Sequence, residues 1–181
     1  MKITPTAISG VLLIEPRVFG DERGYFFESF NARAFAEATG ITAKFVQDNH
    51  SRSVRNTLRG LHYQIQQSQG KLVRAVAGEI FDVVVDLRRS SPSFGKWLGH
   101  RLSAENKMMV WIPPGFAHGF AVLSDYADFL YKTTDYWAPQ HERTLLWNDP
   151  ALAIAWPLAG EPILAAKDRE GKRLAEAEVF D

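Results

Sequence analysis

The sequence predicts an all-β protein, and three observations support that prediction. Nine short runs rich in valine, isoleucine, phenylalanine or tyrosine are separated by turns of glycine, proline, aspartate and serine. Only one segment carries clear helix signals. The 181 residues show no linker, repeat or low-complexity stretch, and they suffice for one sizeable core. We therefore expect a single domain over residues 1–181, built as a β-sandwich or closed roll with a few short helices.

The expected elements follow from local patterns, taken in chain order. The strand-like runs are Val11–Phe19, Tyr25–Phe30, Phe45–Asn49, Leu72–Ala77, Ile80–Leu87, Trp97–Leu102, Met108–Ile112, Gly119–Leu123 and Asp128–Thr134. A further apolar-flanked strand is expected around His62. The clear helix is Ala32–Thr39, because Asn31 can cap its N-terminus and Gly40 suits the position after its last turn. A second short helix is expected after Asp168, through Arg173–Glu176.

Composition excludes several classes of protein. Twenty-one acidic and 21 basic residues give a formal net charge of zero, so neither nucleic acid nor a membrane is an expected partner. The chain has no cysteine, which excludes disulfides, thiolate catalysis and thiolate metal sites and fits a cytoplasmic location. No signal peptide is visible in Met1–Gly10, and no apolar run approaches the ~20 residues of a membrane helix.

The most informative segment is Arg59–Gln64, which contains His62. Lys71 follows it closely, and Tyr131 and Asp168 follow much later. Removal of a proton next to a carbonyl needs a base, a cation for the enolate oxygen and an acid that returns the proton, and these residues could supply all three. Each of them alone has an ordinary structural explanation, and for a single histidine that explanation is the usual one, so the hypothesis depends on the whole set.

The other histidines do not indicate a metal site. His118 lies in Pro113–Phe120, a rigid turn that leads into a strand, where a rim histidine is about as plausible as a ligand contact. A metal site at His62 would need a second ligand two residues on, but that position is Gln64. The remaining histidines lie in unrelated contexts, so we expect no metal.

Basic and aromatic residues suggest a site for a nucleoside diphosphate. Several cations stand beside apolar strands and could turn toward a diphosphate, although a solvated face is the usual explanation for any one of them. They are Arg23, Arg59, Lys71, Arg74 and Lys167. Phe26, Tyr136 or Trp137 could stack on a base, although core packing is the more common role of an aromatic residue.

Seven ordered segments spanning nearly the whole chain resemble one family. They are Asp21–Phe26, Phe45–Ser51, Leu58–Gln64, Lys71–Arg74, Pro113–Phe120, Tyr131–Tyr136 and Lys167–Asp168. Together they closely resemble the dTDP-4-dehydrorhamnose 3,5-epimerases, metal-free cupin enzymes of dTDP-L-rhamnose synthesis. The resemblance implies a cupin-type jelly roll that needs neither a metal nor a cofactor.

The resemblance also implies roles for individual residues. His62 would be the general base with Asp168 as its partner, Tyr131 the proton donor on the opposite sugar face, and Lys71 the group that stabilises the enolate. The expected substrate-binding residues are Arg23, Phe26, Glu28, Gln47, Asp48, Asn49, Arg59, Lys71, His118, Tyr136, Glu142 and Lys167. The family works as a homodimer in which an N-terminal segment reaches the neighbouring site, so Arg23 and Glu28 are expected to act in trans.

We therefore expect an epimerase that converts dTDP-4-dehydro-6-deoxy-D-glucose to dTDP-4-dehydro-L-rhamnose. Two alternatives stay open at the level of sequence. Relatives with similar motifs invert only C3 or only C5 of related dTDP-4-keto sugars. A catalytically silent cupin that binds a nucleotide sugar is the other alternative, but such a protein would not need an acid and a base on opposite faces of its ligand.

Overall fold

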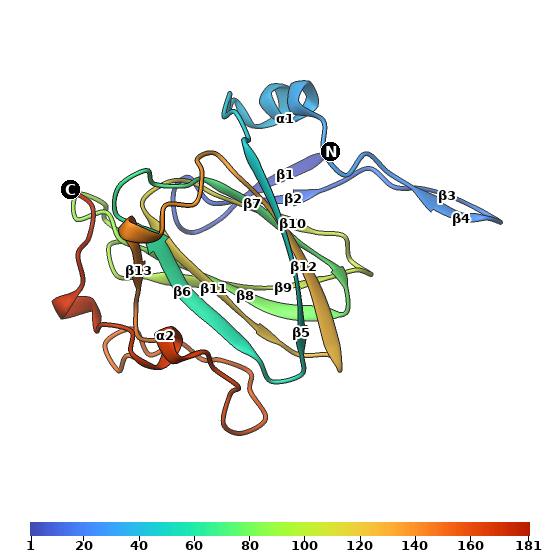
Figure 1. Cartoon of the computed structure of the whole chain (residues 1–181). Helices are drawn as coiled ribbons and strands as arrows, with labels where there is room; N and C mark the ends of the chain where they lie inside the picture. Colours follow the sequence, from blue (N-terminus) through green and yellow to red (C-terminus); the bar gives the residue numbers. More distant parts are fainter.

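A computed structural model describes all 181 residues and shows two facing antiparallel sheets with a projecting hairpin (Figure 1). The first sheet contains, in spatial order, β1 (Lys2–Pro5), β2 (Leu12–Glu15), β10 (Met109–Ile112), β7 (Lys71–Ala77), β12 (Tyr126–Thr133) and β5 (Gln47–Val54). The second contains β13 (Glu142–Thr144), β6 (Leu58–Gln64), β11 (Phe116–Val122), β8 (Glu79–Asp86) and β9 (Trp97–Ser103). The hairpin is β3 (Phe19–Asp21) with β4 (Gly24–Phe26).

Helices are few and short. They are α1 (Ala32–Thr39), α2 (Ala166–Arg169) and two 3₁₀ turns, η1 (Pro139–His141) and η2 (Leu174–Glu176). None of them has the length and apolar character needed to cross a membrane. The prediction of an all-β sandwich with a few short helices is confirmed.

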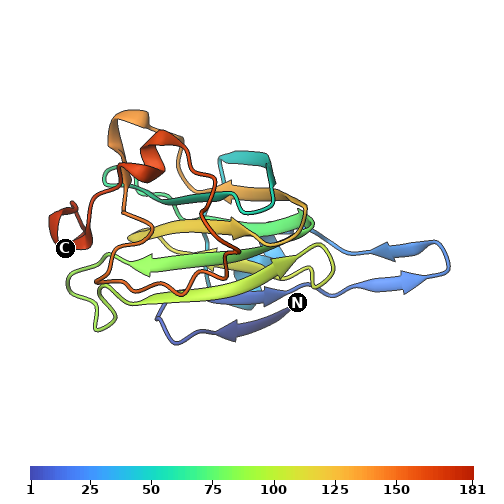
Figure 2. The ribbon, with the colours of Figure 1, turned by 90° about the horizontal axis from the view of Figure 1, so that it is seen from below.

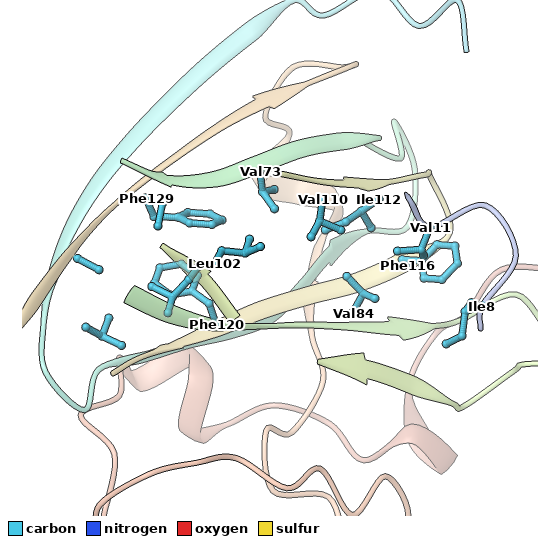
Figure 3. Close-up of a cluster of buried hydrophobic side chains, with 14 residues drawn as sticks. Ile8, Val11, Val73, Val84, Leu102, Val110, Ile112, Phe116, Phe120 and Phe129 are labelled. Atoms are coloured by element: carbon cyan, nitrogen blue, oxygen red, sulfur yellow. The ribbon is translucent and has the colours of Figure 1, made fainter. Parts of the chain in front are cut away.

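Apolar side chains fill the space between the sheets and also cover both outer faces. The central cluster joins residues of the first sheet, such as Val73 and Phe129, to residues of the second, such as Val84 and Phe120 (Figure 3). A second cluster lies under the C-terminal segment, which runs along the outside of the second sheet (Figure 2). A third packs Phe35 of α1 against the first sheet. Because both faces of β11 are covered, all of its residues are buried.

The helix prediction is confirmed at both ends. The Asn31 side chain accepts a hydrogen bond from the Ala34 N–H at 3.1 Å, and Gly40 has a φ of 73°. At that φ a residue with a Cβ would be strained, so glycine stops the helix there. The expected helix at Arg173–Glu176 is only the 3₁₀ turn η2, and Asp168 itself lies in the unpredicted helix α2.

Several strand predictions need correction. Val11–Phe19 is divided, because Pro16 follows β2 and cannot donate to a strand ladder, and Tyr25–Phe30 shortens to β4. β11 begins at Phe116, three residues earlier than predicted, because its whole length pairs with β8. His118 is consequently in the middle of a strand and not at its start.

A bulge in β6 shapes the cavity described below. His118 pairs with His62, but Phe120 pairs with Arg59, so β6 holds one extra residue between these two pairs. Side chains three apart on a regular strand point to opposite faces, whereas the extra residue lets Arg59 and His62 line the same cavity. A Cβ at Gly119 would lie 2.6 Å from the Arg59 carbonyl oxygen, so glycine is needed where the two strands meet.

Candidate active site

A cavity of about 790 Å³ is lined by residues of both sheets and of the segment 163–168. Strands β5, β7 and β12 supply one wall, and β6 and β11 supply the other. Its size suits a ligand larger than a free monosaccharide. Ten of the 27 lining residues are hydrophobic, and most of the others are polar or charged.

His62 and Asp168 form a hydrogen-bonded pair in this cavity. His62 Nε2 lies 2.6 Å from Asp168 Oδ1, and Asp168 is almost completely buried in α2. Burial lowers the pKa of His62 more than the hydrogen bond to Asp168 raises it. The imidazole is therefore neutral at neutral pH, with its Nε2–H donated to the carboxylate and Nδ1 free to take a proton.

Lys71 and Tyr131 come from the opposite sheet. Lys71, on β7, is buried, and the loss of solvation lowers its pKa to about 8 although the carboxylates of Glu142 and Asp82 act in the other direction. Tyr131 lies on β12, and burial raises the pKa of its phenol. The phenol therefore keeps its proton at neutral pH and is available as an acid, and it lines the cavity from the sheet opposite His62.

Polar groups surround this centre and leave donors free for a ligand. Lys167 Nζ donates to both carboxylate oxygens of Glu142 at 3.1 Å, and Arg59 Nε donates to Ser53 Oγ at 2.9 Å. Asn49 Oδ1 accepts from Gln47 at 2.9 Å, but Asn49 Nδ2 is buried without a partner. A buried donor of this kind is costly unless a ligand satisfies it.

A second histidine–carboxylate pair lies on the same wall as His62. His118 Nε2 is 2.6 Å from Asp82 Oδ2, and both side chains are buried. The pairing fixes the orientation of the ring and leaves Nδ1 as the nitrogen that can face the cavity. His118 is thus held as a cavity residue, and the alternative of an exposed rim histidine is wrong.

Some expected binding residues lie outside this cavity within a single chain. Arg23 and Phe26 belong to the β3–β4 hairpin, where Arg23 pairs with Asp21, and Glu28 accepts from Asn31. None of the three lines the cavity. Asp48 is paired with Lys132, also away from the cavity lining.

Of the remaining expected residues, some line the cavity and others do not. Tyr136 is exposed next to Trp137, and only Trp137 lines the cavity. Arg74 lies over the ring of Phe27 and not among the cavity cations. The structure therefore gathers seven of the expected binding residues in the cavity: Gln47, Asn49, Arg59, Lys71, His118, Glu142 and Lys167.

Sequence reasoning missed Asp82, Ser53 and Gln64, which hold the site residues in place. Asp82 was visible as a carboxylate inside an otherwise apolar strand, a pattern that usually requires a buried partner. Nothing in the sequence indicated Ser53 as the partner of Arg59. No group of three or more histidine, aspartate or glutamate side chains is arranged to hold a metal ion.

Comparison with known proteins gives a consistent result. A family profile described as dTDP-4-dehydrorhamnose 3,5-epimerase matches residues 5–176. The dTDP-4-dehydrorhamnose 3,5-epimerase of Pseudomonas aeruginosa is 68% identical over 180 residues, which cover 99% of this chain and 99% of that protein. A dTDP-4-dehydrorhamnose 3-epimerase of Streptomyces niveus is 40% identical over 178 residues, covering 98% of this chain and 86% of that protein.

A solved structure agrees with these relatives. The dTDP-6-deoxy-D-glucose-3,5-epimerase of Legionella pneumophila, crystallised in complex with dTDP-4-keto-L-rhamnose, matches with a TM-score of 0.95 and 55% identity. The match covers 98% of this chain and 94% of that chain. Sequence and structure thus agree over nearly the whole length, and the chain belongs to the dTDP-4-dehydrorhamnose 3,5-epimerase family of cupin-type isomerases.

Proposed function

We propose that this chain converts dTDP-4-dehydro-6-deoxy-D-glucose to dTDP-4-dehydro-L-rhamnose by inverting C3 and C5. One observation carries the proposal: a neutral, carboxylate-paired imidazole on one sheet and a protonated phenol on the other line the same cavity. A sugar ring bound between the sheets would have a base on one side and an acid on the other. Inversion at a carbon requires that arrangement.

His62 begins each inversion. The C4 ketone of the substrate acidifies the hydrogens on C3 and C5, and Nδ1 of His62 takes one of them. Asp168 stabilises the imidazolium that forms and fixes the ring so that Nδ1 points into the cavity. The electron pair moves onto the C4 oxygen and gives an enolate.

Lys71 and Tyr131 complete the reaction. The buried ammonium of Lys71 stabilises the enolate oxygen, and its charge acts strongly because burial reduces screening by solvent. Tyr131 then delivers its proton to the carbon from the face opposite His62. The substrate carries its own electron sink in the ketone, so we propose no redox cofactor and no metal.

The remaining polar groups would hold the nucleotide diphosphate. Arg59 and Lys167 supply cations at the cavity, and Asn49 supplies an unused donor. The Legionella relative is titled as a complex with dTDP-4-keto-L-rhamnose, which supports a ligand of this class. The chain has no cysteine, and we place the enzyme in the cytoplasm.

We also propose a homodimer in which the β3–β4 hairpin completes the partner's site. The hairpin projects from the body with Phe26 67% exposed and Tyr25 62% exposed (Figure 1). β5, at the edge of the first sheet, carries Gln47 and Asn49 and has one unpaired side. Exposed aromatics and an open edge strand are both unfavourable in a monomer, and a second copy would cover them.

Solvent-deuterium incorporation tests the proposed reaction. The substrate is incubated with enzyme in heavy water and analysed by proton NMR. Deuterium at both C3 and C5 is expected. Label at one carbon only would identify a single-site epimerase, the activity named for the Streptomyces niveus relative. Binding without any label would identify a nucleotide-sugar binding protein that is not an enzyme.

A further inference from the structure

The side chain of Gln64, the last residue of β6, uses its whole amide within the protein. It lies in the cavity wall and is 4% exposed. Its Oε1 accepts from the Ala138 N–H at 2.9 Å, and its Nε2 donates to the carbonyl oxygens of Gln67 at 2.8 Å and Tyr136 at 3.2 Å. Both amide hydrogens are occupied, so Gln64 has no donor left for a substrate.

Two of its three partners, Tyr136 and Ala138, lie in the segment 135–138 between β12 and η1, and this segment receives further hydrogen bonds from other side chains. Gln69 Nε2 donates to the Asp135 carbonyl oxygen at 2.9 Å, and Gln47 Oε1 accepts from the Trp137 N–H at 3.0 Å. The Tyr136 N–H donates to the Asp135 carboxylate at 2.7 Å. The backbone of four successive residues outside any strand is therefore held by side chains.

This held backbone carries two large exposed rings, Tyr136 at 61% and Trp137 at 59%. We call these two residues the aromatic shelf. Aromatic surface is usually buried, whereas here it is presented next to the cavity on a fixed backbone. A rigid flat surface binds a planar group well, because no loop has to be ordered when the ligand arrives.

We propose that Gln64 is a positioning residue that fixes the aromatic shelf relative to His62 and thereby sets the affinity for the planar part of the substrate. The proposal rests on the proposed function, in which that planar part is the base of dTDP. His62 and Gln64 are two residues apart on one face of β6, about 7 Å along the strand. One strand thus sets the distance between the proton-abstracting group and the base-binding surface.

A charge-matched pair of variants tests this role. Gln64→Glu keeps the shape and one acceptor, but it loses both donors and places a carboxylate against the carbonyls of Gln67 and Tyr136. Gln66→Glu adds the same charge two residues away at an exposed position whose side chain makes no hydrogen bond. Three quantities are measured on the intact protein: the Kd for dTDP, kcat with KM, and amide hydrogen exchange over residues 135–138.

For Gln64→Glu we expect faster exchange in this segment, a Kd for dTDP about tenfold higher and a kcat within about threefold of wild type. Gln66→Glu should match wild type in all three. Unchanged dTDP affinity in Gln64→Glu would overturn the proposal, and so would a loss of kcat as large as the loss of affinity. If Gln64→Glu does not fold, Gln64→Met removes all three hydrogen bonds without adding a charge, and it is expected to give the same result: weaker dTDP binding with a kcat within about threefold of wild type.

The same measurements separate this proposal from the proposed function. Wild-type protein that failed to bind dTDP would contradict the proposed function. The exchange comparison does not depend on a ligand, so it would still decide the role of Gln64. Faster amide exchange over residues 135–138 in Gln64→Glu, but not in Gln66→Glu, would support the positioning role of Gln64. Equal exchange in the two variants would overturn that role.

Discussion

Lys71 is the residue whose chemistry depends most on its surroundings. Burial lowers its pKa to about 8, so the ammonium needed for the enolate is lost as the pH rises through that value. We expect kcat/KM to fall on the alkaline side with an apparent pKa near 8. The carboxylate of Asp82 raises the pKa of Lys71, so Asp82→Asn should move this alkaline limb to lower pH.

The control for this pH profile is Lys71→Arg. Guanidinium keeps its charge throughout the accessible range, so the limb near pH 8 should disappear even though the overall rate is reduced. A limb that stays in place in Lys71→Arg would show that another group titrates there. If the alkaline limb does not move in Asp82→Asn, the Asp82 carboxylate does not affect the pKa of Lys71.

Tyr131→Phe removes one oxygen from the proposed proton donor. His62 should still form the carbanion, but it can return a proton only to the face from which it came. We expect solvent deuterium to enter with the original configuration while inversion at C5 falls by ~10²-fold or more. Proton NMR in heavy water measures both rates.

Tyr126→Phe is the matched control, because Tyr126 lies on the same strand but is exposed and does not line the cavity. Tyr126→Phe should leave the rates of deuterium incorporation and of inversion unchanged. If Tyr131→Phe lowered the rates of deuterium incorporation and of inversion by equal factors, Tyr131 would not be the acid. It would then be a structural tyrosine whose hydroxyl satisfies a hydrogen bond.

Single residues also show where sequence reasoning succeeds. The pairing of His62 with Asp168 was predicted from the family resemblance, and the structure places the two 2.6 Å apart. The pairing of His118 with Asp82 was not predicted, because β8 and β11 must pair before the two side chains can meet. The two residues are 36 positions apart in sequence, and whether they meet depends on the register in which β8 and β11 pair. A local sequence pattern does not encode that register.

At the scale of elements, the buried carboxylate of Asp86 stabilises the end of β8 by accepting hydrogen bonds from the loop that follows. Burial alone would raise the pKa of Asp86, but hydrogen bonds from Arg88, Ser91 and Ser93 outweigh it and bring the pKa to about 2. A pKa below the ordinary value of 3.8 means that the folded state favours the carboxylate. This contributes about 2 kcal/mol of stability at neutral pH.

The contribution should be lost as the pH falls through about 4 toward 2. We therefore expect Asp86→Asn to lower the free energy of unfolding by about 2 kcal/mol at pH 7, with a difference from wild type that narrows below about pH 4. Denaturant unfolding at several pH values measures it. Asp125→Asn is the control, since this exposed carboxylate pairs with Arg55 at the surface and should change stability by less than ~0.5 kcal/mol.

Elements differ in how well sequence predicts them. The ends of α1 follow from Asn31 and Gly40, which act on their own neighbours, so the helix was predicted in full. The start of β11 and the bulge in β6 depend on partner strands, and the bulge is what lets Arg59 and His62 line the same cavity. α2 has only four residues and no side-chain cap, and its Asp168 bonds to His62, a long-range contact that local helix signals do not indicate.

At the scale of the whole molecule, the projecting hairpin requires an explanation. Within one chain it leaves Phe19, Tyr25 and Phe26 more than half exposed, and it contributes nothing to the cavity. Hairpins of two strands have little stability of their own. A homodimer in which each hairpin covers the partner's site would account both for this exposure and for the absence of Arg23 and Phe26 from the cavity of their own chain.

Complementation between two defective chains tests this arrangement. One chain carries Arg23→Ala and Phe26→Ala in the hairpin, and the other carries His62→Ala in the body. In a mixed dimer with hairpins in trans, the intact body of the first chain receives the intact hairpin of the second. Random pairing makes half of the dimers mixed with one complete site each, so about a quarter of wild-type activity at low substrate should return.

The two parent homodimers and one further mixture serve as controls for this recovery. Each parent alone should show only its own residual activity. His62→Ala mixed with Lys71→Ala should recover nothing, because both residues lie in the body and no exchange of hairpins can restore a complete site. Failure of the hairpin mixture to recover, in a preparation where mixed dimers are shown by mass, would mean that each hairpin serves its own chain.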